Sequence, residues 1–201
     1  MIYNGIPDYI AQNNASKLIE YRKTDKTKLF LHPGRISEPK NQVVLVKVFD
    51  RLIKEGNDVV LLLAGQKQDM QIWSELEPYL NERIIYLGER SDVRDLLAES
   101  DAFCLPSIWE GMPVTLLEAL SVGCIPICSP VGGIPEVINN GENGFLSSDP
   151  SEEAYYNVLC RFLQCAETDM YRIKMNCLES FQKYRITEVA KSYINVYQTK
   201  P

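Results

Sequence analysis

Short apolar runs alternate with stretches of helical periodicity from Lys28 onward. The continuous run at 59–64 (VVLLLA), closed by Gly65, is typical of a strand buried on both faces. After Asn41, apolar residues recur at helical spacing until Gly56, which predicts a helix with Asn41 as its N-cap. The same criteria predict strands at 28–32, 59–64, 84–87, 102–105 and 125–128. They predict further helices at 69–80, 93–99, 113–123, 152–167, 169–184 and 187–198.

This alternation indicates βαβ units and therefore an α/β fold with a doubly wound, Rossmann-like parallel sheet, followed by C-terminal helices. We expect one domain over 1–201: a connecting segment with a polar helix at 1–27, an α/β core at 28–150 and helices at 151–201. Such sheets bind ligands beyond the carboxyl ends of their strands. The loops after the five predicted strands are therefore the places to look for chemistry.

Composition excludes several classes of protein. The 201 residues carry 21 Lys and Arg against 27 Asp and Glu, a net charge of −6, which argues against general nucleic-acid binding. The longest apolar run, 59–64, is too short to span a bilayer, so no transmembrane segment is expected. Residues 1–9 lack the pattern of a signal peptide.

The six cysteines favour a reduced, cytoplasmic protein. Cys104 and Cys128 lie inside apolar runs, where a thiol behaves as a small hydrophobic group. The sequence has no CxxC motif and a single histidine, His32, so a zinc site has few ligands to draw on. No metal site is predicted.

Two loops carry candidate chemistry. Gly34 allows a sharp turn after the first strand, and Arg35 and Lys40 place two cations there that suit a diphosphate. Two solvated surface cations explain the same pattern equally well. In the second loop Glu110 precedes a helix that starts at Pro113 and contains Glu118.

The start of that helix favours an anion. Because Pro113 opens the helix, the amides of Val114 and Thr115 have no partner within it, and they lie at the positive end of the helix dipole. A carboxylate accepts hydrogen bonds from vicinal hydroxyls, so one glutamate could hold a ribose and the other a sugar. Taken singly, each is as well explained as a surface carboxylate.

A third loop, 129–136, contains Gly132 and Gly133. Paired glycines allow close backbone approach to a ligand, but they also serve a turn into a short helix. The sequence contains neither a GxxxxGK[ST] phosphate loop nor an Asp-x-Asp pair for a divalent metal.

Together these segments carry a family resemblance. They are GR-x4-KN at 34–41, PSxxEGMPVTLLEAL at 106–120, GCIPI at 123–127, GGIPEVI at 132–138 and NGENGFL at 140–146. In this order they resemble the C-terminal, donor-binding half of a retaining glycosyltransferase of the GT-B fold (group 1, family 4), the large group similar to glycogen and sucrose synthases.

The resemblance implies roles for individual residues. Arg35 and Lys40 match the pair that contacts the donor diphosphate, Glu110 the first acid of E-x7-E near the donor sugar, and Glu118 the second acid on the ribose. Of these, Glu110, Arg35 and Lys40 are implied to be catalytic. The implied donor-binding residues are Gly34, Arg35, Lys40, Arg90, Val93, Glu110, Gly111, Met112, Pro113, Val114, Thr115 and Glu118. The region 90–93 would border the base, and the family's reaction needs no bound metal.

The implied function is hexosyl transfer from a nucleotide-diphospho-sugar, UDP rather than GDP, to a glycan or glycolipid in cell-surface polysaccharide synthesis. The enzyme would be cytoplasmic or peripheral at the inner membrane face. The family's N-terminal acceptor domain is not in this sequence, so we expect the chain alone to bind nucleotide weakly and to transfer no sugar. The helix at 187–198 would then expose Val189, Tyr193 and Val196 and promote self-association.

Three other functions remain open. A non-catalytic nucleotide-sugar binding module or partner subunit would keep the same residues. A glycoside hydrolase could pair Glu110 with Glu118, although the basic pair and helix amides favour a phosphate-bearing ligand. A nucleotide-sugar epimerase shares the two-domain architecture, but the E-x7-E spacing favours the transferase.

Overall fold

A six-stranded parallel sheet forms the centre of the computed structural model, which describes residues 3–10 and 18–198. The strands are β1 (Lys28–Pro33), β2 (Val59–Ala64), β3 (Ile84–Tyr86), β4 (Ala102–Leu105), β5 (Ile125–Cys128) and β6 (Phe145–Leu146). Their order, β3-β2-β1-β4-β5-β6, confirms the doubly wound fold and puts the topological switch between β1 and β4. The two-residue β6, which pairs with β5, was not predicted because it is too short to show a pattern.

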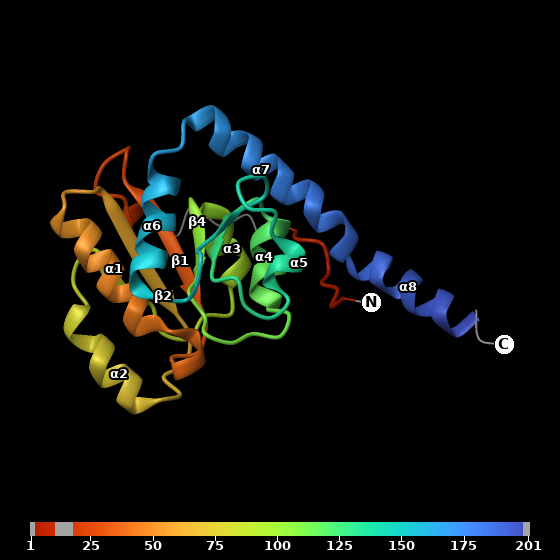
Figure 1. Ribbon diagram of the computed structural model, residues 1–201, viewed down its shortest axis with the longest axis horizontal. Helices are drawn as coiled ribbons and strands as arrows, with labels where there is room; N and C mark the ends of the chain where they lie inside the picture. The colour runs from red at the N-terminus through yellow and green to blue at the C-terminus, as the bar shows by residue number, and fades with distance from the viewer. Residues whose placement is uncertain (1–2, 11–17, 199–201) are drawn as a thin grey trace.

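Helices cover both faces of the sheet (Figure 1). They are α1 (Gln42–Lys54), α2 (Met70–Leu76), α3 (Val93–Glu99), α4 (Val114–Ser121), α5 (Ile134–Val137), α6 (Glu152–Leu163), α7 (Glu167–Phe181) and α8 (Ile186–Gln198). Figure 1 shows α1, α2 and α6 on one side of the sheet and α3, α4 and α5 on the other. Helix α7 packs against α4.

The core follows the predicted apolar pattern. Every residue of β2 is buried, as expected for a strand covered on both faces. On α1, Phe49 lies edge-on to Phe30 of β1, with ring centroids 5.0 Å apart, and Phe162 of α6 meets Phe30 at 5.4 Å. All six cysteines are free, and Cys104 and Cys128 are buried within their strands.

Several helix boundaries differ from the prediction. Helix α2 ends at Leu76 and a 3-10 turn, Glu77–Tyr79, follows it, because Pro78 has no N–H to continue the helix. Pro113 is the N-cap of α4, with an extended backbone, and not its first helical residue. Helix α6 also ends earlier than predicted, at Leu163, and α7 runs from Glu167 to Phe181.

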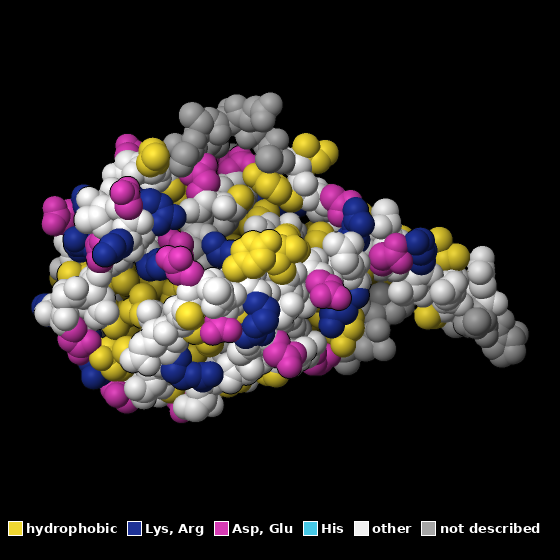
Figure 2. Space-filling model, turned by 90° about the horizontal axis from the view of Figure 1, so that it is seen from above, with side chains coloured by type: hydrophobic (Ala, Val, Ile, Leu, Met, Phe, Trp, Pro, Cys, Tyr) yellow, Lys and Arg dark blue, Asp and Glu magenta, His cyan; other side chains and the backbone are white. Residues whose placement is uncertain are grey.

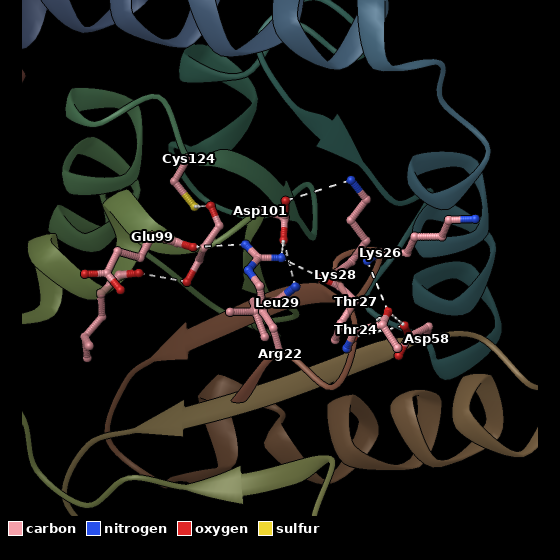
Figure 3. Close-up of polar contacts among 12 residues, drawn as sticks. Arg22, Thr24, Lys26, Thr27, Lys28, Leu29, Asp58, Glu99, Asp101 and Cys124 are labelled. Carbon is pink, nitrogen blue, oxygen red and sulfur yellow. Dashed lines mark hydrogen bonds and ion pairs between the residues drawn. The ribbon is translucent and has the colours of Figure 1, made fainter. Parts of the chain in front are cut away.

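A cluster of polar side chains lies at the amino ends of the strands, where a polar helix was predicted before β1 (Figure 3). Part of that prediction, 11–17, lies outside the described residues, and the described part forms only a 3-10 turn, Ile19–Tyr21. Asp101 accepts from Arg22 at 3.0 Å and from the amide of Leu29 at 2.8 Å. The prediction of a helix is therefore wrong for 18–27, whose polar residues instead anchor the start of β1.

Helix α8 projects away from the body of the molecule (Figures 1 and 2). Its base is tied to the N-terminal segment, where Ile6 donates to Tyr184 O at 3.0 Å and accepts from the amide of Ile186 at 2.9 Å. Contrary to expectation, Val189 is buried, because it lies against the backbone at Gly5. Tyr193 and Val196 are about half exposed, as expected. Among the described helices, none has the length and apolar character needed to cross a membrane.

Candidate functional site

The carboxyl ends of β1, β2 and β3 form the floor of the candidate site. The amide of Gly34 donates to Ala64 O, and the amide of Gly65 donates to Gly88 O, each at 2.8 Å. A Cβ added at Gly65 would lie 2.1 Å from Gly34 O. The loops after β1 and β2 therefore approach so closely that only glycine fits at position 65.

Above this floor lies a pocket of about 230 Å³ beside the β1–β4 switch point. Its walls are Pro33, Gly34, Arg35, Ala64, Gly65, Gln66, Glu89, Arg90, Val93 and Thr115. Five predicted donor-binding residues thus meet here from the β1 loop, the start of α3 and the first turn of α4. This is where a doubly wound sheet binds its ligands.

A second, larger groove of about 560 Å³ shares Arg90 and Val93 with the pocket and contains Glu118. Burial raises the pKa of the Glu118 carboxyl, and the charge of Arg94 opposes that shift. Arg90 is fixed by two hydrogen bonds to Asp92, at 2.9 and 2.7 Å, and this pairing raises the pKa of its guanidinium.

Five of the ten residues that line this groove were not predicted: Asp8, Tyr9, Ile10, Arg94 and Asp95. Asp8 and Tyr9 reach it from the N-terminal segment, and the Tyr9 hydroxyl donates to Asp95 of α3 at 2.8 Å. Their position depends on long-range packing of a segment with no regular pattern. No signal in the sequence could have placed them there.

Lys40 and Glu110 form an ion pair at the far side of the β1 loop. The Lys40 Nζ lies 2.6 Å from Glu110 Oε1, and the hydroxyl of the buried Ser107 donates to the same oxygen at 2.6 Å. Glu110 is only 9% exposed, so these two partners take the place of water around its carboxylate. The structure thus joins two of the predicted catalytic residues, whereas Ser107 was predicted only as part of a motif.

Asn41 docks the β1 loop onto the β4 loop. Its side-chain amide donates to Pro106 O at 3.1 Å and to Pro150 O at 3.0 Å. Asn41 precedes α1 as predicted, but its backbone is left-handed (φ +56°) and its side chain does not cap the helix. Asn41 therefore occupies the predicted N-cap position, but its side-chain amide bonds between loops and does not cap the helix.

The start of α4 faces the pocket through Thr115. Because Pro113 has no polar side chain, the first amides of α4 have no side-chain cap, and helix geometry leaves them without partners inside the helix. Val114 is 46% exposed. Positive partial charge is thus presented next to Arg35 and Arg90.

The glycine pair of the third loop supports the backbone of the Glu110 loop. The amide of Gly133 donates to Gly111 O at 2.8 Å. A Cβ at Gly132 would lie 1.9 Å from Glu110 O, and one at Gly133 would lie 3.0 Å from Gly111 O. The two glycines thus allow the third loop to lie close to the backbone of the Glu110 loop. Met112 O accepts from Asn4 Nδ2 at 3.4 Å.

A buried polar pair lies below the β1 loop and was not predicted as part of a site. His32 Nδ1 lies 2.9 Å from Cys104 O, and Gln42 Nε2 lies 3.0 Å from His32 Nε2 and 2.8 Å from Arg35 O. Burial lowers the pKa of His32 to about 4. A polar residue in the first turn of an otherwise apolar helix face was the signal available at Gln42.

In the described part of the chain, no three His, Cys, Asp or Glu side chains form a group that could hold a metal ion.

Comparison with known proteins gives consistent matches. Residues 15–176 match the family model of glycosyl transferases group 1. N-acetyl-alpha-D-glucosaminyl L-malate synthase of Bacillus anthracis is 26% identical over 202 residues, covering 98% of this chain and 52% of that protein. The UDP-Gal:alpha-D-GlcNAc-diphosphoundecaprenol alpha-1,3-galactosyltransferase of Escherichia coli is 31% identical over 138 residues, covering 66% of this chain and 36% of that protein.

Solved structures share the fold. HepE of Anabaena in complex with UDP and glucose superposes with a TM-score of 0.84 at 20% identity, covering 99% of this chain and 56% of that one. The C-terminal domain of the group 1 family glycosyl transferase LpcC of Francisella tularensis superposes with a TM-score of 0.77 at 22% identity, covering 90% of this chain and 100% of that one. The chain spans about half or less of the length of the first curated relatives it matches.

Proposed function

The chain belongs to the family of group 1 glycosyl transferases, and from this premise we propose that it is the donor-binding half of a retaining enzyme. That enzyme transfers a hexosyl unit from a UDP-sugar to a glycan or glycolipid acceptor. The observation that carries the proposal is the pocket at the β1–β4 switch point, where the β1 loop, Arg90 and the uncapped start of α4 converge.

In this proposal the diphosphate lies between the β1 loop and α4. Arg35 offers a planar fork and Lys40 a compact charge, and both suit phosphate oxygens. The amides of Val114 and Thr115 add donors at the positive end of the helix. As the sugar departs, negative charge builds on the diphosphate, and these groups stabilise it without having to reorganise.

The two glutamates take different parts of the donor. Glu118, in the groove next to Arg90 and Val93, accepts from the ribose hydroxyls while the base borders the 90–93 region. Glu110 lies across the site, with Oε1 already occupied by Lys40 and Ser107. A sugar hydroxyl therefore meets Oε2, and Lys40 is held where its charge reaches the phosphate.

The relatives support the choice of donor and acceptor. HepE was solved with UDP and with UDP-glucose, and the galactosyltransferase relative is named for a UDP-sugar donor and an undecaprenol-linked acceptor. A second relative, from Campylobacter jejuni, is also named for a diphospho-undecaprenol substrate. We therefore place the reaction in cell-surface polysaccharide synthesis, at the cytoplasmic side of the membrane, with the acceptor site on a separate N-terminal domain.

Calorimetric titration with UDP, GDP and ADP tests the proposal. We expect saturable binding of UDP and at least about tenfold weaker binding by Glu118→Ala, since the ribose then loses hydrogen bonds to a charged group. Glu179→Ala, which removes an exposed glutamate of α7, is the matched control and should bind like the wild type. Failure to bind any of the three nucleotides, or equal binding by both variants, would contradict the proposal. Sugar transfer by this chain alone would contradict the need for a separate acceptor domain.

A further inference from the structure

His32 and Gln42 form a buried polar pair beneath the β1 loop. Both side chains are completely buried. His32 is in β1, at the edge where the β1 loop begins, and Gln42 is the first residue of α1, where that loop ends. The pair therefore bridges the two ends of the loop that carries Arg35 and Lys40.

The contacts of the pair determine which of its atoms donate and which accept hydrogen bonds. Gln42 Nε2 lies 2.8 Å from a carbonyl, Arg35 O, so it is the donor in that contact and also toward His32 Nε2 at 3.0 Å. The His32 proton is then on Nδ1, which donates to Cys104 O of β4 at 2.9 Å. Gln42 Oε1 accepts from the amide of Ser37 at 3.3 Å. Hydrogen bonds thus link Cys104 O of β4, through His32 and Gln42, to two backbone groups of the loop, the Arg35 carbonyl and the Ser37 amide.

We propose that His32 and Gln42 are a positioning pair, which holds the backbone around Arg35 in the shape that brings Arg35 and Lys40 to the donor diphosphate. This inference rests on the proposed function. The Arg35 side chain is exposed and makes no ion pair among the described residues, so its direction depends on its backbone. That backbone is fixed on one side by Ile36, whose amide donates to Gln66 O, and on the other by Gln42.

The space around the pair is as restricted as its hydrogen bonds. A Cβ at Gly34 would lie 3.1 Å from His32 Nε2 and 3.9 Å from the Lys40 side chain. The His32 ring therefore lies against the turn at Gly34, and the Gln42 side chain is hydrogen-bonded to the loop at Arg35 and Ser37. A change at either residue should move the loop, whereas the base-binding side of the pocket is built by α3 and α4.

Gln42→Met tests the inference, because it keeps the length of the side chain and removes all three hydrogen bonds. Asn143→Leu is the matched control. Asn143 is also a buried amide with three hydrogen bonds, to Asn139 N, Val137 O and Ser180 Oγ, but it precedes β6, which is an edge strand, whereas β1 lies inside the sheet. Two quantities are measured for each chain: amide hydrogen exchange over 34–40, and the affinities for UDP and for uridine by chemical-shift titration.

We expect Gln42→Met to speed exchange over 34–40 and to weaken UDP binding about tenfold, because buried polar groups of the loop lose their partner. Uridine binding should stay within about twofold, since uridine has no phosphate to meet Arg35. Asn143→Leu should change neither. Unchanged exchange over 34–40, or equal losses for UDP and uridine, would overturn the inference. If the wild type bound UDP no better than uridine, the proposed function would fail, while exchange would still decide whether the pair holds the loop.

Discussion

Acid should destabilise the fold through the one histidine of the chain. Burial lowers the pKa of His32 from 6.5 to about 4, so the folded state resists a proton that the unfolded chain accepts. Between these values the unfolded state binds more protons, and stability therefore rises with pH. The stability contributed by neutral His32 is complete above 6.5 and is lost as the pH falls toward 4. A shift of this size corresponds to a loss of about 3 kcal/mol over that window.

Urea unfolding at pH 7, 6, 5 and 4 measures this slope, with His32→Asn as the comparison. The asparagine keeps an amide donor toward Cys104 O but does not titrate. Glu118, whose raised pKa favours the folded state as the pH falls, and Asp58, whose lowered pKa acts in the opposite direction at lower pH, are present in both chains. Their contributions cancel in the difference. Equal slopes for wild type and His32→Asn would refute the reasoning that His32 is buried in its neutral form.

Three other perturbations test the geometry of the site and of α8. Lys40→Ala leaves the carboxylate of Glu110, which is 9% exposed, without its cation. We expect the free energy of unfolding, measured by urea titration, to fall by about 2 kcal/mol and to recover mostly when Glu110→Gln is added. If the effects of the two substitutions simply add, the pairing is contradicted. Gly132→Ala, at φ +56° and with its new Cβ 1.9 Å from Glu110 O, should lower the free energy of unfolding by about 2 kcal/mol or more. In the control Gly56→Ala, at φ +87°, the new Cβ meets no atom within 4 Å, and the loss should be only about 1 kcal/mol. Equal losses would disprove the contact. Tyr197→Glu, at a side chain 75% exposed on α8, should reduce self-association in light scattering, and a monomeric wild type would contradict that expectation.

The sequence by itself determined the class of fold and most of its elements. Its runs of apolar residues identified β1, β2, β4 and β5, because strands buried on both faces leave a continuous apolar signal that needs no partner to be recognised. Helical spacing identified α1, because a helix with one buried face repeats apolar residues every three or four positions. Segments with ordered motifs also indicated the family, and the loops at the carboxyl ends of the strands followed from the parallel sheet.

Only the tertiary structure decided how those loops meet. The Lys40–Glu110 pair joins residues seventy positions apart, and it exists because β4 lies next to β1, an order that periodicity cannot give. The roles of His32 and Gln42 depend on the same neighbour, whose carbonyl fixes the histidine proton. Local pattern reports which face of an element is buried. Hydrogen bonds between loops depend on which strands lie side by side, and that is settled only when the whole sheet packs.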